Sequence, residues 1–243
     1  AGGIEGTRDA IGIDSILFPT VLERDFDSTL AIFGEVAAPL GPATIEVGSR
    51  LSEFRSYGRE WSGKGAVRAE FGAIDADLGV STGFKAPSLY SLYAPGFGNR
   101  ALRPEESVQV EGGARYAPDA ASVLSVRAFE NRIRNRFGFG ATYLNTARAE
   151  VRGVEFEASR RLPRGFRTFV HATYLASEDV ATGRDLPDVP RWKIGTKLQY
   201  DPSAGHSLTF SALWKSSRTA TLFGGATERL PSFVRLDFGS RHA

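Results

Sequence analysis

The chain has 243 residues with 30 basic and 28 acidic side chains, and its formal net charge of +2 gives no sign of a polyanion-binding protein, so we expect no nucleic-acid partner. It contains no cysteine and only three scattered histidines, which excludes disulfide frameworks, thiol catalysis and cysteine-ligated zinc, and we expect no metal site. No apolar run approaches the ~20 residues that a transmembrane helix needs, whereas the strands of a membrane barrel alternate in polarity and escape hydropathy averages.

Alternation of apolar and polar residues with a period of two runs through the whole chain, and helical periodicity is almost absent. In one typical segment, apolar Val108 and Val110 alternate with polar Gln109 and Glu111. Each such segment is expected to form a strand with one apolar and one polar face. In chain order the predicted strands are 2–14, 28–38, 43–53, 63–71, 74–81, 106–117, 122–131, 148–161, 166–177, 192–200, 207–215 and 232–241.

The connections between these strands alternate between short and long. Five short turns carry breaker residues such as Gly41-Pro42 and Gly72-Ala73. Six longer connections are predicted at 15–27, 54–62, 82–105, 132–147, 178–191 and 216–231. This alternation places every long loop at one end of the strands, as in outer-membrane barrels with short periplasmic turns and longer extracellular loops. We therefore predict an all-β fold, an antiparallel up-and-down transmembrane β-barrel of which about twelve strands are seen; a soluble all-β domain is the alternative.

Charged residues recur on the polar faces of the predicted strands, for example the pairs Asp75 and Asp77, and Glu155 and Glu157. In a closed barrel these side chains would face a wet lumen, and we interpret most of them as wall charges bonded to neighbouring strands. None of the pairs lies in a context that requires general acid–base catalysis. We expect no catalytic residues, no cofactor and no enzyme activity.

The most patterned connection is STGFKAPSLYSLYAPGFGNRALRPEES, residues 81–107, in which Gly83-Phe84-Lys85-Ala86-Pro87 is followed by an aromatic loop, Asn99 and Leu102-Arg103-Pro104-Glu105. The segments at 145–157, 186–200 and 230–241 carry further motifs in the same order along the chain. These segments resemble TonB-dependent outer-membrane receptors, most of all the cobalamin- and siderophore-receptor branch. The resemblance covers about residues 30 to 241.

Members of that family have an N-terminal plug domain, an energy-coupling box and a barrel of 22 strands. The resemblance implies that residues 1–243 are a partial transmembrane β-barrel domain of such a receptor, with the plug domain and the last strands absent from this chain. A genuinely shortened barrel is the alternative interpretation.

The resemblance further implies a segment of a receptor and transporter in the bacterial outer membrane, for energised uptake of a large scarce nutrient such as an iron–siderophore complex, haem or cobalamin. The expected partners are that small-molecule nutrient or metal chelate, outer-membrane lipid and lipopolysaccharide, and TonB, reached through the plug domain. A passive porin-like or structural outer-membrane barrel remains the alternative function.

Aromatic and cationic residues on the long loops are the candidate ligand contacts, because flat aromatic surface and arginine suit bulky, anionic or metal-chelate ligands. The alternative is that these aromatic residues pack the loops together or anchor them at the level of the lipid headgroups. A basic run, Arg132, Arg134 and Arg136, is open to two interpretations, lipopolysaccharide phosphate binding or a solvated loop base. The candidate ligand-binding residues are Tyr90, Tyr93, Phe97, Arg100 and Tyr143.

Overall fold

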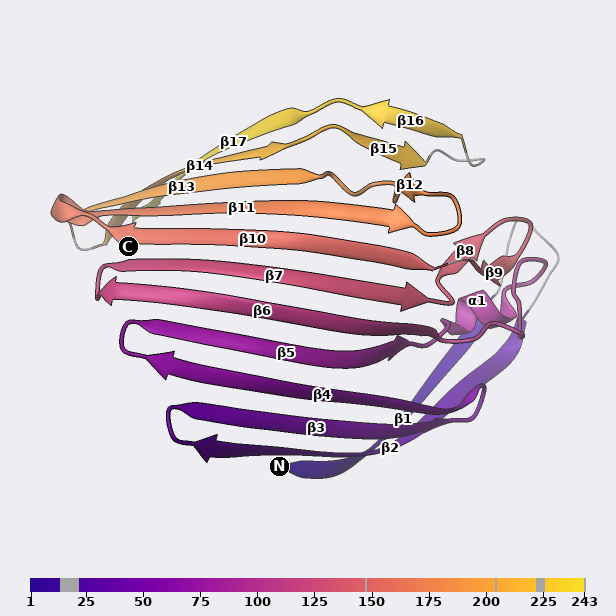
Figure 1. Ribbon diagram of the computed structural model, residues 1–243. Helices are drawn as coiled ribbons and strands as arrows, with labels where there is room; N and C mark the ends of the chain where they lie inside the picture. The colour runs from indigo at the N-terminus through magenta and orange to yellow at the C-terminus, as the bar shows by residue number, and fades with distance from the viewer. Residues whose placement is uncertain (14–21, 147, 204, 222–225, 243) are drawn as a thin grey trace. The chain divides into compact units, whose positions relative to one another are not determined.

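The computed structural model describes residues 1–13, 22–146, 148–203, 205–221 and 226–242, and nearly all of its regular structure is β-strand (Figure 1). Two short helical elements are present among these residues, α1 (Leu89–Tyr93) and a single 3₁₀ turn, η1 (Pro163–Gly165). The strands are β1 (Gly2–Ile13), β2 (Leu22–Leu40), β3 (Ala43–Phe54), β4 (Gly58–Phe71), β5 (Ile74–Lys85), β6 (Glu105–Asp119), β7 (Ser122–Arg134), β8 (Phe137–Phe139), β9 (Tyr143–Asn145), β10 (Ala149–Arg161), β11 (Phe166–Asp179), β12 (Arg184–Asp185), β13 (Trp192–Ser203), β14 (His206–Lys215), β15 (Arg218–Thr221), β16 (Thr227–Leu230) and β17 (Phe233–His242).

Twelve long strands pair in chain order, β1-β2-β3-β4-β5-β6-β7-β10-β11-β13-β14-β17, with β12 added beside β11. The pairs β1–β2, β2–β3, β11–β13, β13–β14 and β14–β17 are antiparallel over most of their lengths. Two separate hairpins, β8–β9 and β15–β16, lie outside this path. Each of the twelve predicted strands corresponds to one strand of the sheet, which confirms the prediction of an antiparallel, up-and-down all-β fold.

One face of the strands carries apolar side chains that remain exposed. In β3, Val47 and Leu51 are 58% and 44% exposed, and in β17 Leu236 and Phe238 are 63% and 74% exposed. Their neighbours in sequence are polar or small, because successive side chains point to opposite faces of a strand. A broad exposed apolar face of this kind is what the lipid-facing side of a membrane strand requires.

The chain divides into two compact units, one of residues 1–67, 79–110 and 131–149, the other of residues 68–78, 111–130 and 150–243. Few apolar side chains are buried in either unit. Among the described residues they are Ala31, Leu92, Ala94, Leu102 and Ala149 in the first unit and Leu186 and Ala220 in the second. The strands are therefore held mainly by their hydrogen-bonded ladders, and the small cluster around Leu92 belongs to a loop.

Some connections differ from the prediction. The long loop expected at 54–62 is a turn of three residues, because β3 runs to Phe54 and β4 starts at Gly58, whose φ of +89° allows the tight reversal. Strand β2 begins at Leu22, within the loop predicted at 15–27; the first part of that predicted loop, residues 15–21, and the last residue of the strand predicted at 2–14 lie outside the described residues. The short elements α1, β8, β9, β12, β15 and β16 were not predicted. Among the described residues no helix has the length and apolar character needed to cross a membrane.

Candidate functional site

Two connections of the first compact unit form the candidate site. The helical loop, residues 86–104, joins β5 to β6 and contains α1. The hairpin loop, residues 135–148, joins β7 to β10 and contains β8 and β9; residue 147 is not described. In Figure 1 the elements α1, β8 and β9 lie side by side, and the hydrogen bonds described below join the two loops.

The helical loop is a compact structure with its own small core. Ser88 caps α1, because its Oγ accepts a hydrogen bond from the Ser91 backbone N–H at 3.0 Å. Leu92, Ala94 and Leu102 are each at least 95% buried beneath the loop surface. The chain then folds back so closely that a Cβ on Gly98 would lie 2.7 Å from the Ala94 nitrogen, which only glycine can accommodate.

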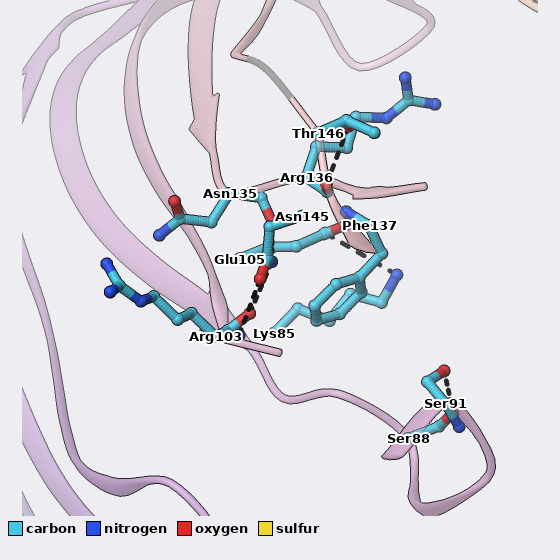
Figure 2. A network of polar contacts seen from close by, with 10 residues as sticks. All are labelled: Lys85, Ser88, Ser91, Arg103, Glu105, Asn135, Arg136, Phe137, Asn145 and Thr146. Atoms are coloured by element: carbon cyan, nitrogen blue, oxygen red, sulfur yellow. Dashed lines mark hydrogen bonds and ion pairs between the residues drawn. The ribbon is translucent and has the colours of Figure 1, made fainter. Parts of the chain in front are cut away.

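Asparagine side chains join the two loops (Figure 2 shows Asn145). The Oδ1 of Asn145 accepts a hydrogen bond from the Arg103 N–H at 2.8 Å. Its Nδ2 donates to the carbonyls of Arg103 at 2.8 Å and Asn135 at 2.7 Å. In a second contact Asn99 Nδ2 donates to the Tyr143 carbonyl at 2.9 Å, while the Tyr143 N–H donates to the Phe97 carbonyl at 3.0 Å.

Glu105, the first residue of β6, ties the hairpin loop to the sheet. Its Oε1 accepts a hydrogen bond from the Phe137 N–H at 2.6 Å, and its side chain is only 14% exposed. The Lys85 ammonium lies 3.8 Å from Glu105 Oε2 and 5.5 Å from the centre of the Phe137 ring. A charge-assisted hydrogen bond in a partly buried place is stronger than its solvated counterpart, so Glu105 fixes the base of the hairpin loop.

Four aromatic rings form a connected surface across the two loops, which we call the aromatic patch: Tyr90, Phe97, Phe139 and Tyr143. Phe139 and Tyr143 have ring centroids 4.9 Å apart; Tyr90–Tyr143 and Phe97–Phe139 are 6.3 and 6.2 Å apart. These are the usual distances of interacting aromatic pairs. Tyr90 is 47% exposed, Phe97 46% and Phe139 61%, so the patch packs the loops together and still presents ring surface outwards.

The remaining two predicted residues form a pair of their own. The Arg100 guanidinium carbon lies 4.9 Å from the centre of the Tyr93 ring, a cation–π arrangement. The Tyr93 hydroxyl lies 3.4 Å from Ser56 Oγ in the β3–β4 turn. The structure thus brings Tyr90, Phe97 and Tyr143 together and places Tyr93 and Arg100 beside them on the helical loop; that any of the five contacts a ligand stays a prediction.

The β3–β4 turn holds one unusual phenol. The hydroxyl of Tyr57 is buried and has no hydrogen-bond partner within the described residues, while its ring stacks on Phe54 at 4.4 Å. Burial raises the pKa of Tyr57 well above its usual value, and the nearby carboxylates of Asp27, Glu60 and Asp9 raise it further. The phenol is therefore neutral at any physiological pH.

Positive charge is concentrated in the two connections. The helical loop and the hairpin loop contain four basic side chains and no acidic one, a formal net charge of +4 in a chain whose total is +2. The basic residues are Arg100, Arg103, Arg136 and Arg148. A surface that combines this charge with exposed rings favours a large anionic ligand that has flat unsaturated groups.

The loop residues that organise the site, Phe139, Asn99, Asn145 and Glu105, were not among the predicted site residues. Asn99, Asn145 and Glu105 were visible only as parts of the motifs that carry the family resemblance. Phe139 stands in the segment FGFG at 137–140, where an aromatic between glycines in a polar loop was the available signal.

The polar face of the second compact unit is lined by paired charges. Arg127 donates two hydrogen bonds to Asp77, at 2.9 and 2.8 Å, and its Nη1 lies 3.6 Å from Glu111. Arg115 donates to Asp75 at 3.0 Å. These contacts confirm the interpretation of Asp75 and Asp77 as wall charges. They border a cavity of about 470 Å³ that is also lined by Arg68, Glu70, Glu155 and Glu157.

Comparison with known proteins identifies the family. Residues 6–242 match the family described as "TonB dependent receptor-like, beta-barrel". The vitamin B12 transporter BtuB of Vibrio cholerae is 30% identical over 164 residues, covering 65% of this chain and 26% of BtuB. The iron-regulated outer membrane virulence protein of V. cholerae is 26% identical over 237 residues, covering 82% of this chain and 36% of that protein.

Solved structures agree on the fold. The ferric enterobactin receptor PfeA of Pseudomonas aeruginosa superposes with a TM-score of 0.78 at 20% identity, covering 90% of this chain and 38% of PfeA. The chain therefore spans between about a quarter and two fifths of the length of these proteins. With the antiparallel sheet and its exposed apolar face, the match over nearly the whole chain shows that it belongs to the TonB-dependent receptors, non-enzymatic transporters of the bacterial outer membrane, as part of their β-barrel.

Proposed function

We propose that this chain supplies part of the ligand-capture surface and part of the pathway wall of a receptor that takes up a large anionic metal chelate, such as an iron–siderophore complex or haem. The observation that carries the proposal is the pair of joined loops with the aromatic patch and a net charge of +4. The wall is the polar strand face with its Arg127–Asp77 and Arg115–Asp75 pairs.

The two properties of the loops support the same ligand class. Exposed rings of Tyr90, Phe97 and Phe139 offer dispersion and stacking contacts to flat groups such as catecholates or a porphyrin. The excess of basic side chains attracts negative charge and speeds its arrival, an effect that ionic strength screens. An electrically neutral ligand would gain from the rings alone.

Cobalamin is the second candidate, because the chain is 30% identical to a vitamin B12 transporter over 164 residues. Cyanocobalamin is neutral, so the loop charge does not favour it. Other members of the family, at lower identity, have names that refer to iron, and the name of a relative does not identify the substrate of this chain.

Energy coupling belongs to the same proposal. We infer that the receptor works with TonB through a plug domain, with lipid on the apolar strand face and lipopolysaccharide at the loop level as its other partners. A passive porin-like or structural barrel is the competing account, and dependence of uptake on TonB separates the two.

The test is a ligand panel on the intact protein in detergent. Ferric enterobactin, haemin and cyanocobalamin are titrated at low and high ionic strength while quenching of intrinsic fluorescence is followed. We expect saturable binding of an anionic chelate that weakens as salt is raised. Binding of cyanocobalamin alone, with no dependence on salt, would reject the anionic class in favour of a corrinoid.

A further inference from the structure

We propose that Asn145 is a positioning residue that locks the hairpin loop to the helical loop, so that the aromatic patch exists before the ligand arrives. The proposal rests on the proposed ligand-capture function of this surface and names the device that prepares it. No contact between Asn145 and the ligand is required.

The hydrogen bonds of Asn145 give it this role. Its amide makes a two-way bridge with the backbone of Arg103, donor and acceptor both at 2.8 Å, as a neighbouring strand would do. Its second amide proton goes to the Asn135 carbonyl at 2.7 Å, at the start of the same hairpin loop. One side chain therefore bonds to three backbone groups, two on the helical loop and one on the hairpin loop (Figure 2).

The position of Asn145 connects these bonds to the aromatic patch. It is the last residue of β9, which starts at Tyr143, and β9 pairs with β8, which ends at Phe139. Phe137 pairs with Asn145, and Phe139 pairs with Tyr143. Two of the four patch rings thus stand on a small hairpin whose open end is closed by Thr146, which donates from its N–H and Oγ1 to the Arg136 carbonyl, and is joined to the helical loop by Asn145.

The other hydrogen bonds that hold the hairpin loop do not replace those of Asn145. Glu105 holds Phe137, on the strand opposite Asn145, and Asn99 holds the Tyr143 carbonyl at the other end of β9. A hairpin of two three-residue strands is too short to be stable alone, so its orientation depends on such outside contacts. Without Asn145, the loop end next to Arg103 loses its bonds and the patch is expected to be complete only part of the time.

If the loop holds the binding-competent conformation for only part of the time, the apparent affinity for the ligand falls, although the contacts in the bound state are unchanged. The apparent dissociation constant equals the intrinsic constant divided by the fraction of molecules that are competent, so it rises as that fraction falls, and binding at saturation is unchanged. Loss of Asn145 contacts therefore predicts a slower association, an apparent Kd raised by about tenfold or more, and the same final amplitude.

The experiment compares two isosteric substitutions in the intact protein. Asn145→Asp keeps the Oδ1 acceptor for the Arg103 N–H. It replaces the amide nitrogen, which donates to the carbonyls of Arg103 and Asn135, by a carboxylate oxygen that can only accept. Asn135→Asp is the matched control, because the side chain of Asn135 points away from Asn145 and makes no hydrogen bond among the described residues. Its left-handed backbone, φ +55°, tolerates Asp. Both variants have the same net charge and composition, and Asn145→Ala is a second variant if the carboxylate prevents folding.

Two measurements are made on each variant. Hydrogen exchange followed by mass spectrometry reports on residues 99–104 and 135–146 without any ligand. Stopped-flow fluorescence with ferric enterobactin, or with haemin if only haemin binds, gives the association rate, the Kd and the amplitude.

The expected result is faster exchange in both segments of Asn145→Asp than of Asn135→Asp, with an unchanged amplitude and a Kd above that of Asn135→Asp, which carries the same added charge. Unchanged exchange overturns the lock, and faster exchange with unchanged Kd overturns the positioning role. If the wild-type protein binds neither probe, the proposed anionic ligand class fails, and the exchange measurement alone decides whether Asn145 holds the loops.

Discussion

Replacing Asp77 by Asn tests the polar wall of the barrel most sharply. Arg127 reaches Asp77 with two hydrogen bonds of 2.9 and 2.8 Å, and the side chains are 36% and 27% exposed. A charge-assisted two-point contact contributes about 1.5–3 kcal/mol when buried, and exposure of about a third reduces this to roughly 1–2 kcal/mol. Asn can accept only one of the two bonds and leaves Arg127 with Glu111 at 3.6 Å.

Asp75→Asn is the matched control on the same face of the same strand. Its partner Arg115 makes one hydrogen bond of 3.0 Å, and the side chains are 50% and 38% exposed. A surface pair of this kind contributes roughly 0.2–1 kcal/mol. Both variants change the net charge equally, so their difference reports on the geometry and the burial of the two pairs.

Stability is measured as the free energy of unfolding in urea, followed by far-ultraviolet circular dichroism and by the heat-modifiable migration of the folded barrel on a gel. Asp77→Asn is expected to lose about 1 kcal/mol more than Asp75→Asn. Equal losses in the two variants would refute the assignment of a specific two-point contact, and losses in neither would show that the wall charges are individually solvated.

Three further predictions concern the loops. Tyr57→Phe removes a buried hydroxyl without a partner in the described part of the chain, so the free energy of unfolding at neutral pH should be unchanged or about 1 kcal/mol higher. Folding raises the pKa of Tyr57, so the protonated phenol contributes its full share of stability below the ordinary tyrosine pKa of about 10 and loses it as pH rises above that value. The free energy of unfolding of the wild type should therefore fall at high pH relative to that of Tyr57→Phe. An equal dependence on pH in the two proteins would contradict this. Gly98→Ala puts a methyl group 2.7 Å from backbone atoms and should speed hydrogen exchange throughout the helical loop. Gly96→Ala has open space around the new methyl group but a φ of +76°, so it should lower the free energy of unfolding by only about 1 kcal/mol. Equal exchange rates in the two variants would show that the loop does not depend on the close approach at Gly98. Arg100→Ala should weaken binding of an anionic chelate and flatten its dependence on salt, and an unchanged salt dependence would remove Arg100 from the ligand surface.

The strands could be predicted from sequence because side-chain alternation records which face meets lipid, and this pattern holds along each strand whatever its neighbours are. The β3–β4 turn was missed because Arg55, Ser56, Arg59 and Glu60 look like a polar loop. They are in fact a turn and the polar start of β4, which begins five residues before the predicted strand 63–71.

The loops could be predicted only in part. Aromatic and basic residues marked the candidate surface, but α1, with five residues, and the three-residue strands β8 and β9 are too short to carry a readable period. Which ring meets which is decided by Asn145, Asn99 and Glu105, whose hydrogen bonds are made to backbone groups about 30 to 45 residues away. Any residue type can offer a backbone N–H or carbonyl, so the sequence does not reveal which residues are the partners of these side chains. The motif could therefore be recognised from the sequence, but its geometry could not.

The most direct test of the central claim is uptake of a radioactive iron chelate by iron-starved cells that make the intact protein as their sole receptor, with and without functional TonB. The chelate is the anionic ligand that binds in the panel, and Phe139→Ala on the aromatic patch is compared with Phe238→Ala on the exposed apolar strand face. The account predicts saturable uptake that requires TonB and is reduced by Phe139→Ala but not by Phe238→Ala. Uptake that persists without TonB and is indifferent to Phe139 would contradict it and favour a passive barrel.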